Sequence, residues 1–131
     1  MLQDRFGRTI DYLRISVTDR CDLRCAYCIP KGFRGFEIPQ SWLTIDEIAR
    51  VVRVFASMGT KRIRLTGGEP LLRKDLTELV GNLRSIDGVE DLSLSTNATR
   101  LAIHAYDLKR AGLDRINVSL DSLRGECVQQ I

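Results

Sequence analysis

Apolar and polar residues alternate in four short stretches, at residues 12–17, 62–65, 91–95 and 115–120. Between these stretches, apolar residues recur at intervals of three and four, which is typical of helices with one buried face. A chain that alternates strands with helices usually forms parallel strands joined by right-handed crossover helices. The pattern therefore predicts an α/β fold with a parallel sheet.

Three helices are expected between the strands, starting at Thr44 and covering residues 75–84 and 101–111. The first has the clearest start, because the Thr44 hydroxyl can cap the amide of Glu47 while the Glu47 side chain reaches back.

The other two helices have weaker signals. Asp75 and Glu78 are spaced to repeat the capping arrangement at the start of the second helix. In the third helix, Ala105 and Leu108 are expected to face inward. Each helix should therefore bury one apolar stripe against the sheet.

The strands carry a second pattern, in which one face is apolar and the other is polar. The apolar positions include Leu13, Ile15, Ile63, Leu65, Leu92, Leu94, Ile116, Val118 and Leu120. The opposite positions are Arg14, Ser16, Arg64, Thr66, Ser93, Ser95, Asn117 and Ser119. Parallel strands are normally buried on both faces, so a polar face suggests a lumen that holds a ligand. The alternative is an antiparallel sheet with one solvated face.

Charge and hydropathy exclude several classes of protein. The net charge of +3 is too small to argue for nucleic-acid binding, although clustered basic residues could bind a small anion. No apolar run approaches the roughly 18 residues of a membrane span, and the N-terminus lacks the apolar core of a signal peptide. A cytoplasmic protein that binds neither membrane nor nucleic acid is expected.

Three cysteines, Cys21, Cys25 and Cys28, lie close together just after the first expected strand. Cysteines this near on one loop more naturally converge on a metal than form disulfides. Three thiolates leave one iron of a four-iron cluster without a protein ligand, and an open site of this kind favours catalysis. The alternative is structural zinc with His104 or Cys127 as fourth ligand; Cys127 otherwise belongs to no motif.

The spacing CxxxCxYC, followed by GGEP at residues 67–70, resembles the signature of the radical S-adenosylmethionine (radical SAM) superfamily. Within that superfamily, four runs are similar to the GTP 3′,8-cyclases of molybdenum cofactor biosynthesis. They are SVTDRCDLRCAYC, RIRLTGGEPLLR, STNATRL and RINVSLDSL. The resemblance covers residues 10–123.

The resemblance implies roles for individual residues. Cys21, Cys25 and Cys28 would hold a [4Fe-4S] cluster. S-adenosyl-L-methionine would contact Tyr27, Gly67, Gly68, Glu69, Asn117 and Ser119, and GTP would contact Arg14, Arg64 and Ser95, where the family commonly has threonine. From the residues alone, the two glycines of GGEP at a strand end permit close approach to a ligand, and the alternative is only a tight strand-to-helix turn. The two arginines could pair with Asp121 or Glu69 instead of a triphosphate.

The resemblance also implies a reaction, the conversion of GTP to 3′,8-cyclo-7,8-dihydro-GTP, with no protein acid or base assigned. A complete (β/α)8 barrel takes about 250 residues, so residues 1–131 are expected to be the first four units of an incomplete TIM-type barrel, inactive alone. A homodimer and a downstream cyclic pyranopterin monophosphate synthase are the implied partners, and the electron donor is not indicated. The alternatives are a peptide-modifying radical SAM enzyme and a non-catalytic iron-sulfur or zinc module.

Overall fold

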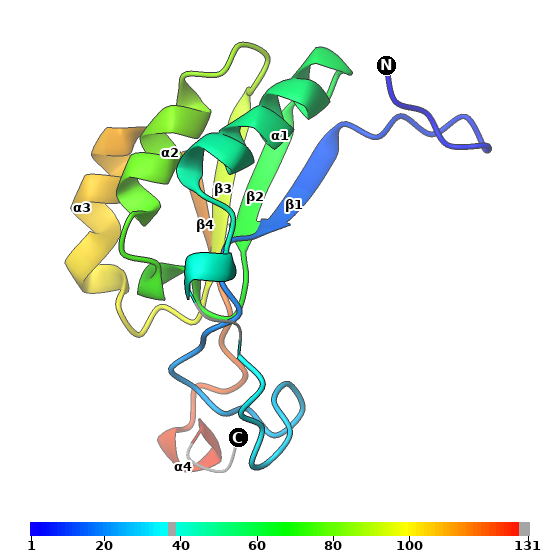
Figure 1. Ribbon diagram of the computed structural model, residues 1–131. Helices are drawn as coiled ribbons and strands as arrows, with labels where there is room; N and C mark the ends of the chain where they lie inside the picture. Colours follow the sequence, from blue (N-terminus) through cyan, green and yellow to red (C-terminus); the bar gives the residue numbers. More distant parts are fainter. Residues whose placement is uncertain (37–38, 129–131) are drawn as a thin grey trace.

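Parallel strands and helices alternate along the chain in a computed structural model, which describes residues 1–36 and 39–128 (Figure 1). The strands are β1 (Tyr12–Ser16), β2 (Arg62–Thr66), β3 (Asp91–Thr96) and β4 (Arg115–Val118). They form one sheet in the order β1-β2-β3-β4, and every neighbouring pair is parallel. The prediction of a parallel α/β fold is confirmed, and the antiparallel alternative is wrong.

Helices cover one face of this sheet. They are α1 (Ile45–Ser57), α2 (Leu76–Arg84) and α3 (Leu101–Ala111), with a short α4 (Gly125–Val128) and 3-10 turns η1 (Pro39–Ser41) and η2 (Pro70–Leu72). Figure 1 shows α1, α2 and α3 on the same side of the strands. The opposite side, called the open face below, carries no helix from the described residues. None of the described helices is long and apolar enough to cross a membrane.

The core lies between the sheet and the three helices. Its strand residues Ile63, Leu65, Leu92 and Leu94 are completely buried, as the alternation predicts. The pattern does not hold to the end of β4, where Val118 is 51% exposed and Leu120 lies beyond the strand. These two residues lie at and beyond the end of an edge strand, and both remain more than half exposed.

The start of α1 follows the sequence prediction. The Thr44 hydroxyl accepts a hydrogen bond from the Glu47 amide at 3.3 Å, and the Glu47 carboxylate accepts one from the Thr44 amide at 2.8 Å. The predicted cap on α2 is wrong, because Asp75 makes no capping bond and instead pairs with Arg73. In α3, Leu108 is buried as predicted, but Ala105 is exposed.

Arg73 is a buried link between three parts of the fold, with only 6% of its surface exposed. Its guanidinium donates to the carbonyls of Val17 and Leu43, each at 3.0 Å, and to the Asp75 carboxylate at 2.7 Å. A buried arginine is stable only when its donors find acceptors, and these three supply them. The contacts fix the end of β1 against the starts of α1 and α2.

Candidate functional site

The three clustered cysteines lie on one loop that leaves the carboxyl end of β1. All are free thiols; Cys21 and Cys25 are half-buried and Cys28 is exposed. The Cys28 amide donates to the Cys25 carbonyl at 2.9 Å, so these two share a tight turn. Across residues 1–36 and 39–128, no three Cys, His, Asp or Glu side chains gather closely enough to hold a single metal ion. The loop therefore places the thiols on one segment without drawing their sulfurs to one point.

The glycines of the GGEP segment pack against the start of this cysteine loop. The Gly68 amide donates to the Thr18 carbonyl at 2.8 Å, and the Glu69 amide donates to the Arg20 carbonyl at 2.6 Å. A Cβ on Gly68 would lie 2.2 Å from the Arg20 carbonyl oxygen, and one on Gly67 would lie 2.3 Å from that of Thr18. The close backbone approach expected at these glycines is thus made to the chain leading into Cys21.

Glu69 joins the ends of β2 and β3. Its side chain is only 1% exposed, and its carboxylate accepts hydrogen bonds from the Leu71 amide, the Thr96 hydroxyl and the Asn97 amide at 3.0, 2.6 and 2.7 Å. Three donors offset the cost of burying the charge. With its oxygens so engaged, Glu69 does not pair with Arg14 or Arg64.

Asp22 and Asn97 form a second connection between the cysteine loop and the sheet. The Asn97 amide group donates to Asp22 at 2.8 Å, and the Thr99 hydroxyl donates to the same carboxylate at 2.6 Å. Burial works to raise the pKa of Asp22, but hydrogen bonds from Thr99 and Asn97 hold it below its ordinary value. Burial raises the pKa of the neighbouring Cys21 thiol, as does the charge of Asp22. Sequence reasoning gave these polar residues no role, because Asp22 and Asn97 are 75 positions apart and no sequence pattern connects them.

Tyr27 forms a third connection, to the chain after β4. Its hydroxyl donates to the Asp121 carboxylate at 2.8 Å. That hydrogen bond, with smaller effects from burial and from the Cys25 thiol, raises the pKa of Tyr27. In Figure 1 the cysteine loop lies beside the segment that follows β4, as this contact requires. Asp121 thus pairs with Tyr27, not with an arginine.

The open face carries the two predicted arginines in adjacent positions. Arg14 lies opposite Arg64 in the register of β1 and β2, and Arg64 lies opposite Ser93 on β3. The Arg64 guanidinium donates to the Ser93 hydroxyl at 3.4 Å and lies 5.4 Å from the centre of the Tyr12 ring. Ser95 lies two residues after Ser93, nearer the carboxyl end of β3, and is opposite Asn117 on β4. Ser119 follows the end of β4.

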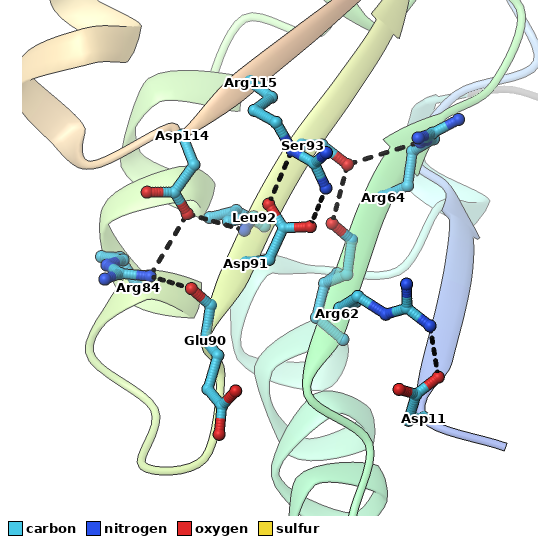
Figure 2. Close-up of polar contacts among 11 residues, drawn as sticks. Asp11, Arg62, Arg64, Arg84, Glu90, Asp91, Leu92, Ser93, Asp114 and Arg115 are labelled. Carbon is cyan, nitrogen blue, oxygen red and sulfur yellow. Dashed lines mark hydrogen bonds and ion pairs between the residues drawn. The ribbon is translucent and has the colours of Figure 1, made fainter. Parts of the chain in front are cut away.

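Other arginines of this sheet are paired with carboxylates, as Figure 2 shows. Arg62 binds Asp11 at 2.6 Å, and Arg115 binds Asp91. Within residues 1–36 and 39–128, Arg14 and Arg64 form no ion pair with a carboxylate. The internal salt bridge considered from the sequence is therefore absent from the described part of the chain, and two like charges lie side by side.

Comparison with known proteins places this arrangement in a family. A family model described as the radical SAM superfamily matches residues 15–131. The chain belongs to the radical SAM superfamily. The resemblance noted in the sequence is thereby confirmed at the level of the superfamily, whose members use a [4Fe-4S] cluster and S-adenosylmethionine. The three reduced thiols on one loop are a donor set that fits such a cluster, with one iron left for another ligand.

Curated relatives of this radical SAM chain include proteins named GTP 3′,8-cyclase. The one from Listeria welshimeri is 50% identical over 131 residues, covering 100% of this chain and 39% of the relative. Those from Limosilactobacillus fermentum and Staphylococcus aureus (strain Mu3) are 48% and 49% identical over 130 and 134 residues, each covering 99% of the chain and 39% of the relative. The chain thus spans about two fifths of the length of these relatives.

Solved structures of BtrN share the fold of this radical SAM chain. An open conformation matches 91% of the chain and 54% of BtrN with a TM-score of 0.64 and 21% identity. A complex with AdoMet and 2-DOIA matches 93% of the chain and 50% of BtrN, with a TM-score of 0.65 and 19% identity. The four parallel strands therefore correspond to part of a radical SAM barrel, as predicted.

Proposed function

We propose that the protein containing this chain is a GTP 3′,8-cyclase, which converts GTP to 3′,8-cyclo-7,8-dihydro-GTP in the first step of molybdenum cofactor biosynthesis. Identity of about half to relatives with that name, over essentially the whole chain, supports the proposal. The structural observation that carries it is the pair Arg14 and Arg64, which lie side by side on the open face without a carboxylate partner among the described residues.

Adjacent arginines of this kind suit a polyphosphate. A guanidinium remains charged in proteins and offers a planar fork of donors that matches phosphate oxygens. Neighbouring strands are only about 4.8 Å apart, so two unpaired guanidiniums repel each other until an anion lies between them. We propose that Arg14 and Arg64 bind the phosphates of GTP, and that the Ser95 hydroxyl, near the carboxyl end of β3, makes a further contact with the nucleotide.

Cys21, Cys25 and Cys28 are proposed to bind three irons of the cluster, and S-adenosylmethionine the fourth. A cluster held by these thiolates would supply the electron needed to cleave the sulfonium of S-adenosylmethionine. No side chain described here is assigned as an acid or base. The role of these residues is to bind and orient the reactants.

The proposed contacts to S-adenosylmethionine lie around the carboxyl ends of the strands: Tyr27, Gly67, Gly68, Glu69, Asn117 and Ser119. The amides of Gly68 and Glu69 already donate to the cysteine loop, and the Glu69 carboxylate already accepts three hydrogen bonds. The Glu69 carboxylate can accept a fourth hydrogen bond, and backbone carbonyls of this segment are further acceptors; we propose these groups for the methionine ammonium.

Three further proposals rest on the resemblance to GTP 3′,8-cyclases alone. They are a homodimeric state, a cytoplasmic location and a pathway in which cyclic pyranopterin monophosphate synthase acts next. Size-exclusion chromatography with light scattering would test the first on the natural protein.

GTP affinity of the natural protein containing these residues tests the proposal directly. Each of Arg14→Ala and Arg64→Ala should remove a charge-assisted hydrogen bond, which is worth about 1.5 to 3 kcal/mol and corresponds to roughly 10- to 150-fold weaker binding. Arg62→Ala is the matched control, because Arg62 lies on the same strand but is paired with Asp11. Calorimetry on the anaerobically reconstituted protein should show that Arg62→Ala binds GTP with unchanged affinity.

Unchanged GTP affinity in both Arg14→Ala and Arg64→Ala would overturn the cyclase proposal. It would favour another radical SAM enzyme, such as one that modifies a peptide. Reducing the reconstituted protein in the presence of S-adenosylmethionine distinguishes either enzyme from a passive metal-binding module. Only an enzyme of this superfamily should release 5′-deoxyadenosine.

A further inference from the structure

The side-chain amide of Asn97, just after β3, lies between Asp22 and the sulfur of Cys21. One N–H donates to the Asp22 carboxylate at 2.8 Å, while the amide nitrogen is 4.0 Å from the Cys21 sulfur, at the outer limit for an N–H to sulfur bond. The Thr99 backbone determines the orientation of this side-chain amide, because its N–H donates to the side-chain oxygen Oδ1 of Asn97 at 3.0 Å. Because a backbone N–H can only donate, the NH2 group must face Asp22 and Cys21.

The backbone of Asn97 is fixed as well. The backbone N–H of Asn97 donates to the buried Glu69 carboxylate at 2.7 Å, which connects Asn97 to the end of β2. The Leu23 amide also donates to the Cys21 sulfur, at 3.4 Å. Cys21 therefore lies beside two N–H groups, one from its own loop at Leu23 and one from Asn97 at the end of the sheet, and Asp22 places a negative charge next to it.

We propose that Asn97 is a positioning residue that tunes the iron-sulfur cluster through its N–H directed at the Cys21 sulfur, and that Asp22 acts in the opposite direction. Reduction adds negative charge to the cluster and its thiolates. A donor to a ligand sulfur stabilises that charge and raises the reduction potential, whereas an adjacent carboxylate opposes it. The two side chains bind each other, so the potential reflects a balance between them.

Redox titration of the natural protein containing these residues, monitored by electron paramagnetic resonance without GTP, tests this balance. The signal to follow is the one that changes when S-adenosylmethionine is added, because this change assigns it to the cluster proposed at Cys21, Cys25 and Cys28. Asn97→Ala should shift the potential downward, and Asp22→Asn should shift it upward. In Asp22→Asn the new amide can still accept from Asn97, and the Thr99 hydroxyl can turn to accept from it.

Asn82→Ala is the matched control, because Asn82 lies on the exposed side of α2 and its amide donates only to the Glu78 carbonyl, at 3.1 Å. Its potential should equal that of the unaltered protein. Asn97→Ser provides a smaller change in case Asn97→Ala loses iron. Iron content is measured for every variant, so that potentials are compared on intact clusters.

Shifts of opposite sign in the Asn97 and Asp22 variants, at unchanged iron content, would support the proposal, since general damage to the loop would move both in one direction. Shifts of the same sign, or no shift, would overturn it. Loss of the cluster from both Asn97 variants would also overturn it, because the amide would then serve assembly instead of tuning. As GTP is absent, none of these outcomes bears on the cyclase proposal.

Discussion

A single methyl group added at Gly68 should disrupt the start of the cysteine loop. The Cβ of Gly68→Ala would lie 2.2 Å from the Arg20 carbonyl oxygen and 2.7 Å from that of Asp19, and both are backbone atoms that no rotamer change can move. Reaching ordinary contact requires a shift of about 1 Å. That shift would break the amide bonds from Gly68 to Thr18 and from Glu69 to Arg20.

The cost follows from these contacts. Two lost backbone hydrogen bonds cost about 1 kcal/mol each, and overpacking adds about 1 to 3 kcal/mol, so the free energy of unfolding should fall by about 3 to 5 kcal/mol. Because the displaced segment leads into Cys21, iron content after anaerobic reconstitution should also fall. Thermal melting and iron analysis of the natural protein measure the two effects.

Gly81→Ala is the control for this prediction. Gly81 lies inside α2, and a Cβ there would meet nothing within 4 Å. Alanine in a helix interior should stabilise the protein by about 0.5 to 1 kcal/mol. If Gly68→Ala melts at the same temperature as Gly81→Ala and loads as much iron, the steric argument is refuted.

Other contacts give smaller and more local effects. Arg73→Ala removes the donors to two backbone carbonyls in the interior and should cost about 2 to 4 kcal/mol in chemical denaturation; a loss under about 1 kcal/mol would contradict the role of Arg73 as a structural link. Thr44→Ala should cost about 1 kcal/mol through the lost cap, while Thr44→Ser should restore most of it. The hydrogen bond with Arg62 lowers the pKa of Asp11, so this pair stabilises the fold above about pH 4 and the effect is lost as the pH falls through the lowered pKa. The melting temperatures of the unaltered protein and Asp11→Asn should therefore converge in acid, and a constant difference would count against the pairing.

The sequence predicted the fold correctly where a local pattern alone determines the secondary structure. Alternation marked every strand, and the Thr44 and Glu47 spacing marked the start of α1, because those contacts form between residues close in the chain. The same reasoning failed at Asp75, whose carboxylate is taken by Arg73. A capping pattern states which bond a side chain can make, but not which neighbour competes for it.

The residues of the candidate site could also be predicted only in part from the sequence. The cysteines and arginines could be found because their residue types are costly or unusual at those positions. The contacts of Asn97 with Asp22, and of Tyr27 with Asp121, join residues 75 and 94 positions apart. No periodicity connects such pairs, so only the folded chain shows them. It also shows why the GGEP glycines are needed beside Thr18 and Arg20, a steric requirement invisible in the sequence.

Three attachments join the cysteine loop to the sheet: Gly68 at the end of β2, Asn97 after β3 and Asp121 after β4. Free energy released by binding a metal cluster to the loop is therefore shared with these strand ends, since binding to the folded state also stabilises whatever is coupled to it. When the cluster is lost to oxygen or iron shortage, these strand ends should be less stable and should unfold locally more often. In a cell, unfolded segments are what proteases cleave, so the lifetime of this protein should depend on its iron supply.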